Sequence, residues 1–384
     1  MAVALRLVES KQFCDQVDVD LGAGVRGVHS LQGAFAHALP WQPSIARYVL
    51  DRFSERGDFV LDSFCDSGHV GLECLQAGRH FVGSSHDRAL ARLATARLDP
   101  ADLGEVALRL QLVNLKRPVD VRGFTAPFTM FFDVDTFCEL VNLRSLLTNS
   151  SERVDRFLQF IVAGVIHGHT VGHLSGYTSP NVALSQDAQA QLNSKRGEVP
   201  SYRAVAPRIL RKAAALLQDG IPSVLQQGDL SSSIIAADPR NLSKVGTASI
   251  GLAMTCLDQP GFVENTLSSW LRAWWLGIDA SSGLPRPKLT TTESWRMYCN
   301  EVLLETARVV RRGGRTVVRA GHGRVGSKVI NYREELSAVL NEGLGGYWAT
   351  EGTIVERHVN TAGLVKNSEK KLAAPGELVV LRRK

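Results

Sequence analysis

The segment from Val60 to Ser85, VLDSFCDSGHVGLECLQAGRHFVGSS, constrains the fold of this 384-residue chain more than any other. It begins in an apolar run, FVLDSF, that is typical of a buried parallel strand. A glycine-containing turn, a helix over about 70–77 and a second apolar run, HFVGSS, follow. This order is that of a βαβ unit, whose strands are parallel and whose crossover is nearly always right-handed. The segment therefore predicts an open α/β sheet.

Strands and helices alternate near both ends of the chain, but this alternation is interrupted in its middle. Helical spacing predicts helices over 44–56, 87–96 and 294–310. Between 100 and 220 the strands stop, and we expect helices over 153–166 and 204–217 with a polar, loop-like stretch over 175–201. Further strands are expected in SVLQQGD, ASIGLAMT, RTVVRAG, GTIVERHV and GELVVLRRK, and the glycine-rich patch GAGVRG within the first thirty residues is interpreted as loop. The middle of the chain is therefore an insertion into the sheet domain.

Composition narrows the class of protein. The chain is 44% hydrophobic and 21% charged, as in ordinary folded proteins, and its net charge of +6 is mild. Its six cysteines include no C-x-x-C pair, so we expect neither a disulfide framework nor a metal site. The start turns polar too soon for a signal peptide, and no apolar run approaches the length of a membrane span. We expect a cytoplasmic protein that does not enter membranes.

The same residues resemble a known family. Asp62, Phe64 and Gly68, followed by the strand ending at Ser85, are similar to the cofactor loop and second strand of S-adenosylmethionine-dependent DNA amino-methyltransferases. Other segments resemble that family in the right order, namely AFAHALPWQPSIARYVLDRF, QQGDL, RVVRRGGRTVV and ELVVLRRK. The resemblance implies a class I fold: a doubly wound, mostly parallel, seven-stranded Rossmann-like methyltransferase sheet with a mostly helical insertion.

The resemblance also implies a division of the chain. Residues 1–56 form an N-terminal segment that packs on the cofactor side, and 57–99 form the first half of the methyltransferase domain. Residues 100–220 form the helical insertion, and 221–384 form the second half of the domain.

The sequence differs from the family at positions that bind the cofactor. The resemblance assigns cofactor binding to positions 62, 64, 66, 68, 85 and 229, which here carry Asp62, Phe64, Asp66, Gly68, Ser85 and Asp229. Asp66 replaces a loop glycine and brings negative charge toward the methionine end of the cofactor. Ser85 replaces the acid that holds the ribose hydroxyls, and losing such charge-assisted hydrogen bonds weakens binding roughly ten- to a hundred-fold. Asp229 matches the acid near the adenine amino group.

The catalytic tetrad of the family is also altered. It should read Ser/Asp/Asn-Pro-Pro-Tyr/Phe, and its aromatic ring stacks on the flipped-out base. The aligned residues are Cys256, Leu257, Asp258 and Gln259, without either proline or the ring. Asp258 or Gln259 still offers an acceptor for an amine. A cysteine nucleophile at Cys256 is a further interpretation, beside that of a small core residue.

Several other groups have both a structural and a functional interpretation. Nucleic-acid contact is proposed for the basic stretch that contains Arg203, Arg208, Arg211 and Lys212, although such charges also suit a solvated helix face. Three histidines, His167, His169 and His173, lack an acidic or cysteine partner at metal-binding spacing, so no metal is assigned. The tryptophans Trp270, Trp274 and Trp275 suit the core face of a helix better than base stacking.

Three functions remain open. The first is a degenerate methyltransferase, a pseudoenzyme that keeps the fold in order to bind nucleic acid or a protein partner, such as a catalytic paralogue, without a cofactor. The second is an active S-adenosylmethionine-dependent DNA methyltransferase that acts on the adenine N6 or cytosine N4 amine. The third is a methyltransferase-fold enzyme that acts on RNA or another substrate.

Overall fold

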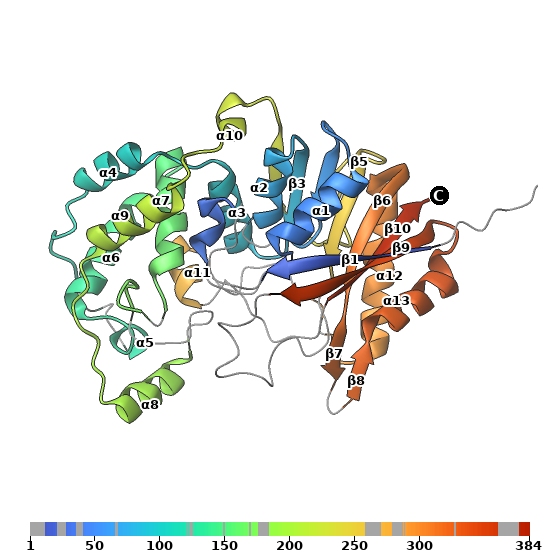
Figure 1. The fold of residues 1–384 in the computed structure, drawn as a ribbon. Coiled ribbons are helices and arrows are strands. Elements are labelled where there is room, and N and C mark those ends of the chain that lie inside the picture. Colours follow the sequence, from blue (N-terminus) through green and yellow to red (C-terminus); the bar gives the residue numbers. More distant parts are fainter. Residues whose placement is uncertain are drawn as a thin grey trace, which may run out of the picture.

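The computed structural model describes residues 12–20, 28–35, 41–65, 68–120, 122, 126–148, 150–168, 170–175, 184–257, 270–278, 287, 289–325, 328–359 and 376–384. Its centre is an eight-stranded sheet in the order β1-β9-β10-β6-β5-β2-β3-β4 (Figure 1). The strands of this sheet are β1 (Phe13–Asp20), β2 (Phe59–Asp62), β3 (His80–Ser85), β4 (Ser232–Ala236), β5 (Ile250–Cys256), β6 (Val310–Ala320), β9 (Trp348–Val359) and β10 (Glu377–Arg383). A separate hairpin joins β7 (His322–Val325) to β8 (Lys328–Asn331).

The sheet is parallel except at one strand. Neighbouring strands from β4 to β6 pair in parallel, and so do β1 and β9. Strand β10 runs antiparallel to both β6 and β9, between which it lies. The chain leaves β2 toward β3 and later returns on the other side as β5, so the direction of winding reverses at β2.

Both faces of the sheet are covered, because adjacent strand residues point to opposite sides. Val60 and Leu252 enter one core, whereas their neighbours Leu61 and Ala253 enter the other. The first core is covered by α1 (Pro43–Phe53), α2 (His69–Gln76) and α3 (Arg88–Leu98), and the second by α12 (Thr292–Val309) and α13 (Tyr332–Val339), which continues into η4 (Leu340–Leu344). The predicted doubly wound α/β class is confirmed.

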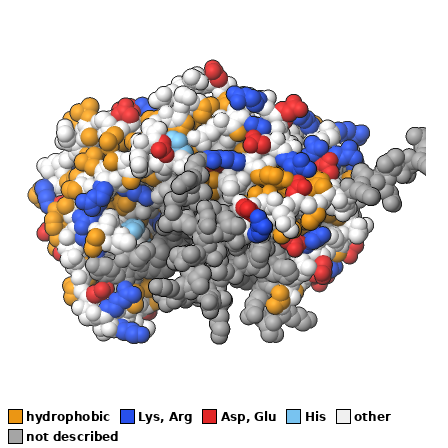
Figure 2. All heavy atoms as spheres, in the orientation of Figure 1, with side chains coloured by type: hydrophobic (Ala, Val, Ile, Leu, Met, Phe, Trp, Pro, Cys, Tyr) orange, Lys and Arg blue, Asp and Glu red, His pale blue; other side chains and the backbone are white. Residues whose placement is uncertain are grey.

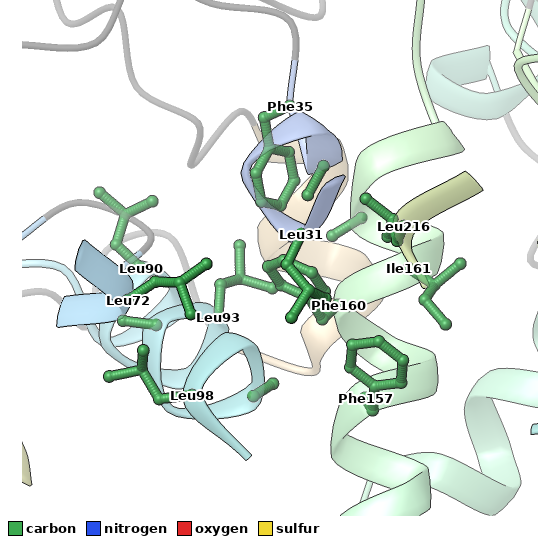
Figure 3. Packing of buried hydrophobic residues seen from close by; sticks show 14 of the residues in the cluster. Leu31, Phe35, Leu72, Leu90, Leu93, Leu98, Phe157, Phe160, Ile161 and Leu216 are labelled. Atoms are coloured by element: carbon green, nitrogen blue, oxygen red, sulfur yellow. The ribbon is translucent and has the colours of Figure 1, made fainter. Parts of the chain in front are cut away.

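The segment between β3 and β4 is mostly helical, as predicted. After α3 come α4 (Leu103–Gln111), α5 (Ala126–Thr129), α6 (Val134–Leu147), α7 (Arg153–Val165), α8 (Gln186–Arg196), α9 (Val205–Leu216) and α10 (Ser223–Gln227). The short η1 (Ser30–Ala34) and α11 (Trp270–Leu276) join these helices to the sheet domain. Leu31 and Phe35 pack beside Phe160 of α7, with Leu90 and Leu93 of α3 close by (Figure 3). The insertion therefore shares the first core of the sheet.

Three details correct the sequence-based expectations. The sheet has eight strands, because β1 forms near the N-terminus where no strand is predicted, whereas the predicted loop GAGVRG lies outside the described residues. The predicted strand SVLQQGD is instead the helix α10, and the strand β4 comes after it. Helix α8 lies within the predicted loop 175–201. Among the described helices, none is both long and apolar enough to cross a bilayer.

Candidate functional site

The carboxyl ends of β2, β3 and β5 form the candidate site. In doubly wound sheets, ligands bind beyond the carboxyl ends of the strands where the winding reverses, which here is at β2. Asp62 ends β2, Ser85 ends β3 and Cys256 ends β5. The structure therefore brings three of the predicted site positions to one edge of the sheet.

The turn after β2 is fixed by hydrogen bonds of its own. Asp62 is buried, and its Oδ1 accepts a hydrogen bond from the backbone N–H of Phe64 at 3.1 Å. The Ser84 hydroxyl donates to the carbonyl of Ser63 at 2.8 Å, and the N–H of Cys65 donates to the carbonyl of Ser84 at 2.8 Å. The turn is thus tied to the end of β3.

Gly68 caps the helix that follows this turn. Its φ of +81° lies in the left-handed region, and a Cβ at this position would lie 3.1 Å from backbone atoms of Ala94 in α3. Glycine is therefore required both by the conformation and by the close approach of α3. Asp66 and Ser67 lie outside the described residues, so the interpretation of Asp66 remains a prediction.

The side chains of Ser85 and Asp87 form hydrogen bonds with nearby backbone groups at the end of β3. The Ser85 hydroxyl lies 3.2 Å from both the backbone N and the carbonyl O of Asp87. The Asp87 carboxylate caps α3, where Oδ1 accepts hydrogen bonds from Ala89 N at 2.7 Å and Leu90 N at 3.2 Å. A carboxylate used in this way satisfies helix N–H groups that otherwise lack a partner. Both side chains thus accept hydrogen bonds from nearby backbone N–H groups.

A further acidic residue, which the sequence analysis did not predict as part of the site, lies at this edge. Asp238 follows β4, and its Oδ1 lies 3.6 Å from Nε2 of the buried His86. Burial opposes ionisation of Asp238, yet hydrogen bonds from Arg240 keep its pKa below the ordinary value. An acid directly after the apolar run IIAA, residues 234–237, is the signal that would have identified it.

The structure does not bring Asp229 to this edge. Asp229 lies between α10 and β4, at the amino end of the strand, and it is exposed. The predicted position near the adenine assumed that QQGD ended a strand, whereas here the strand begins three residues after it. Asp229 and Ser85 therefore lie at opposite ends of the paired strands β3 and β4.

The tetrad positions begin at the end of β5. Cys256 is half-buried and packs against the first core, and Leu257 is buried in the second. Thr255, just before them, lies with its hydroxyl 3.5 Å from that of Ser63. Asp258 and Gln259 lie outside the described residues, so their roles remain predictions.

Three of the four predicted nucleic-acid contacts are held by the protein itself. Arg203 is buried, and its guanidinium donates to the carbonyls of Thr170, His173 and Ser175. Arg208 donates to the carbonyl of Val171 and Lys212 to that of Gly33. Only Arg211 of the four is exposed. On the face in Figure 2, Lys and Arg side chains lie interspersed with acidic and apolar ones.

The histidines and tryptophans occupy packed positions. The His167 ring lies beside Ser175, with 3.3 Å between Nδ1 and Oγ, and His173 bonds to Thr170, whereas His169 is not described. Trp275 is buried and donates to the carbonyl of Gln159 at 3.0 Å. Trp274 stacks on Phe137, and Trp270 packs against Phe128 and Phe131. The core interpretation of the tryptophans agrees with these contacts.

The described carboxylates at this edge already accept hydrogen bonds from the protein, which bears on the adenosine end of S-adenosylmethionine. A ribose diol needs acceptors, and the carboxylates at this edge are already used: Asp87 by α3, and Asp238 by Arg240. The Ser85 hydroxyl is held by its own turn. At the end of β3, the described carboxylate of Asp87 thus has its Oδ1 committed to the start of α3.

A search of family models found no match to this chain. The sequence is 35% identical over 83 residues to the type II methyltransferase M.XycI of Xanthomonas campestris pv. cyanopsidis. This match covers 20% of the chain and 28% of that protein, so the chain spans well under two thirds of this relative.

Several solved structures overlap most of the chain at low similarity. TrmN from Thermus thermophilus has a TM-score of 0.36 and 11% identity, with coverage of 92% of this chain and 52% of TrmN. The rRNA methyltransferase aviRa from Streptomyces viridochromogenes has a TM-score of 0.34 and 14% identity, with 92% and 91% covered.

The decisive observation for the fold is the strand order itself, with its reversal at β2 and the antiparallel β10 between β6 and β9. The fold is a Rossmann-like, doubly wound α/β fold with one antiparallel strand.

Proposed function

We propose that this chain is a methyltransferase-like protein of DNA amino-methyltransferase descent that has lost amine methylation and acts by binding a partner. The observation that carries the proposal is the end of β3. There Ser85 stands where a ribose-binding acid is expected, and the nearest acid, Asp87, caps α3 with the oxygen that bonds Ala89 and Leu90. The altered residues 256–259 and Asp66 support the same conclusion from the sequence.

The positions of the basic residues favour a protein partner over nucleic acid. Arg203, Arg208 and Lys212 donate to carbonyls of neighbouring segments, so most of the expected phosphate contacts are instead structural ties. Affinity for nucleic acid depends on several exposed cations acting together. Arg211 alone does not supply such a surface.

The proposal is tested by calorimetry with S-adenosylmethionine. We expect the natural chain to bind it more weakly than about 100 µM, and the double variant Asp66→Gly, Ser85→Asp to gain at least tenfold in affinity, because a charged hydrogen bond contributes about 1.5–3 kcal/mol. Ser243→Asp, which adds the same charge in an exposed loop, should leave binding unchanged. Micromolar binding by the natural chain would contradict the proposal.

The second candidate is an active DNA methyltransferase, and the match to a type II methyltransferase favours it. Transfer of a tritiated methyl group to mixed DNA distinguishes the two. The leading proposal expects no transfer above a heat-denatured control, whereas transfer that Asp258→Ala or Gln259→Ala abolishes would establish the second. Transfer to RNA alone would instead indicate another substrate on the same fold.

A further inference from the structure

Strand β4 forms one edge of the sheet and pairs with β3 alone among the described strands. The N–H of Phe81 donates to the carbonyl of Ser231, and the N–H of Ala237 donates to the carbonyl of Ser85. Because backbone groups alternate in direction along a strand, 231, 233, 235 and 237 face β3. The N–H and C=O groups of Ser232, Ile234 and Ala236 therefore face away from the sheet.

This edge lacks the devices that normally protect a free strand. Natural edge strands are blocked by lysine, proline, a bulge or an inward-pointing charge. Residues 232–236, SSIIA, contain none of these, and their pairing with β3 runs without a register shift. Ser232 and Ala236 are exposed, and Ile234 and Ile235 are half-buried. The edge is thus a template for a further strand.

A groove of about 230 Å³ lies on the sheet face next to this edge, opposite the face that α3 covers. Its base consists of apolar side chains from three adjacent strands, Phe59 of β2, Val82 of β3 and Ile235 of β4. Phe59 is 40% exposed, which is unusual for an aromatic ring at the start of a central strand. The groove has room for an apolar side chain from a strand added beside β4.

The loop from 244 to 249 forms the opposite wall. Ala248 has a φ of +54°, an uncommon conformation for a residue with a Cβ, and its N–H donates to the carbonyl of Arg308 at 2.9 Å. The Ser249 hydroxyl donates to the carbonyl of Gly246 at 2.7 Å. Lys244 lines the groove, is exposed, and forms no ion pair within the described part of the chain. The wall thus presents one cation beside an apolar base.

We propose that the β4 edge binds an extended peptide of a partner protein, which adds as a strand and carries an apolar side chain two residues from an acidic one, so that both point to the groove. Backbone hydrogen bonds to Ser232, Ile234 and Ala236 supply affinity, as in other cases of strand addition. The groove on Phe59, Val82 and Ile235 takes the apolar side chain, and Lys244 pairs with the acid. This inference rests on the proposed partner-binding function and names the surface and the chemistry of the partner.

The probe is a capped, fluorescently labelled hexapeptide, Thr-Val-Thr-Glu-Thr-Val, whose valine and glutamate side chains share one face of the strand. Its binding to the full chain is followed by fluorescence anisotropy. We expect saturable binding that Lys244→Glu weakens at least tenfold, and we expect the Lys244→Glu variant to prefer the corresponding valine–lysine peptide. Lys195→Glu, the same change at an exposed position on α8, should bind like the natural chain.

Backbone pairing is tested separately. Two peptides, each N-methylated at alternate amides, block opposite edges of the added strand, and only one of them should bind. Ser232→Pro removes an outward N–H without removing a bond to β3, so the sheet should remain intact by circular dichroism while binding falls.

Several results would overturn the proposal. These are the absence of binding at millimolar peptide, equal binding of both N-methylated peptides, or equal binding by the Lys244→Glu variant. A concentration-dependent dimer that Ser232→Pro dissociates would assign the edge to a second copy of the chain instead. Methyl transfer would refute the proposed loss of activity but leave these binding results unaffected, so the two proposals fail separately.

Discussion

The guanidinium of Arg109 donates two hydrogen bonds, of 2.7 and 2.9 Å, to the two oxygens of the Asp155 carboxylate. This pair joins α4 to α7 within the insertion, and the Asp155 side chain is completely buried. Burial acts to raise the pKa of Asp155, but the hydrogen bonds from Arg109 hold it below its ordinary value. The carboxylate is thus kept charged inside the protein chiefly by Arg109, with a further hydrogen bond from Ser150.

Arg109→Ala should therefore destabilise the fold by about 3 kcal/mol, because it leaves a buried charge without its cation. Since the folded pKa of Asp155 is lowered, the pair stabilises fully above the unfolded pKa of about 3.9 and loses its effect as pH falls through the folded value. Urea denaturation between pH 3 and 7 should show the difference shrinking below about pH 4. Arg122→Ala, which removes an exposed partner of Asp120, should change little, and equal losses would contradict the prediction.

Gly68→Ala tests the cap of α2. The left-handed conformation costs about 1–2 kcal/mol for a residue with a Cβ, and the added methyl would also press on Ala94. Gly57→Ala is the matched control, since Gly57 has a φ of +84° but a Cβ added there would meet no atom within 4 Å. Thermal unfolding should show a larger drop in Tm for Gly68→Ala. If both variants lose the same amount, the approach of α3 does not matter.

Arg203→Lys should lower stability by about 1–3 kcal/mol, although it keeps the charge. A lysine ammonium lacks the planar set of donors that reaches the carbonyls of Thr170, His173 and Ser175. The same change at exposed Arg211 should stay within about 0.5 kcal/mol. Chemical denaturation of both variants measures the contrast, and an unaffected Arg203→Lys protein would show that Arg203 behaves as a surface cation.

Lys212 should make stability depend on alkaline pH. Burial, with a contribution from Arg97, lowers its pKa from 10.5 to about 8. Between these values the unfolded chain binds more protons, so the free energy of unfolding should rise with pH across this range. Relative to Lys212→Met, the natural chain should gain stability between pH 7 and 10, as measured by urea denaturation. Lys195→Met should show no such trend, and a flat difference for Lys212 would refute the assignment.

Much of the fold was predictable because its strongest signals are local. The apolar runs around Leu61 and Val82, with a glycine turn and a short helix between them, determine the βαβ unit without any distant contact. Strand β1 was missed because FCDQVDVD contains three aspartates, one of which, Asp15, shares the strand face of Phe13 and Val17 and so breaks the apolar alternation. Helix α8 was missed because its surface is polar on nearly all sides, so its sequence lacks the helical spacing of apolar residues that predicts a helix.

The candidate site was less predictable than the fold, because the role of each altered residue depends on where its side chain points. The sequence shows a serine at 85 and an acid at 87, but only the structure shows that Asp87 caps α3. The sequence likewise presents Arg203 as one cation among several, whereas its burial depends on carbonyls from residues 170–175. The prediction for Asp229 was wrong because it relied on the resemblance of QQGDL to a family motif, whereas the strand is formed by the apolar residues that follow Asp229.

Strand β1 pairs in parallel with β9, so Phe13 lies opposite Gly352 and Asp20 opposite Val359. More than three hundred residues separate these partners, and closing so long a loop is slow. During synthesis, the first strand must therefore wait beside an unfinished sheet until the last strands leave the ribosome. A stalled or truncated product that ends before Trp348 would expose that strand, which makes it a target for chaperones and proteases.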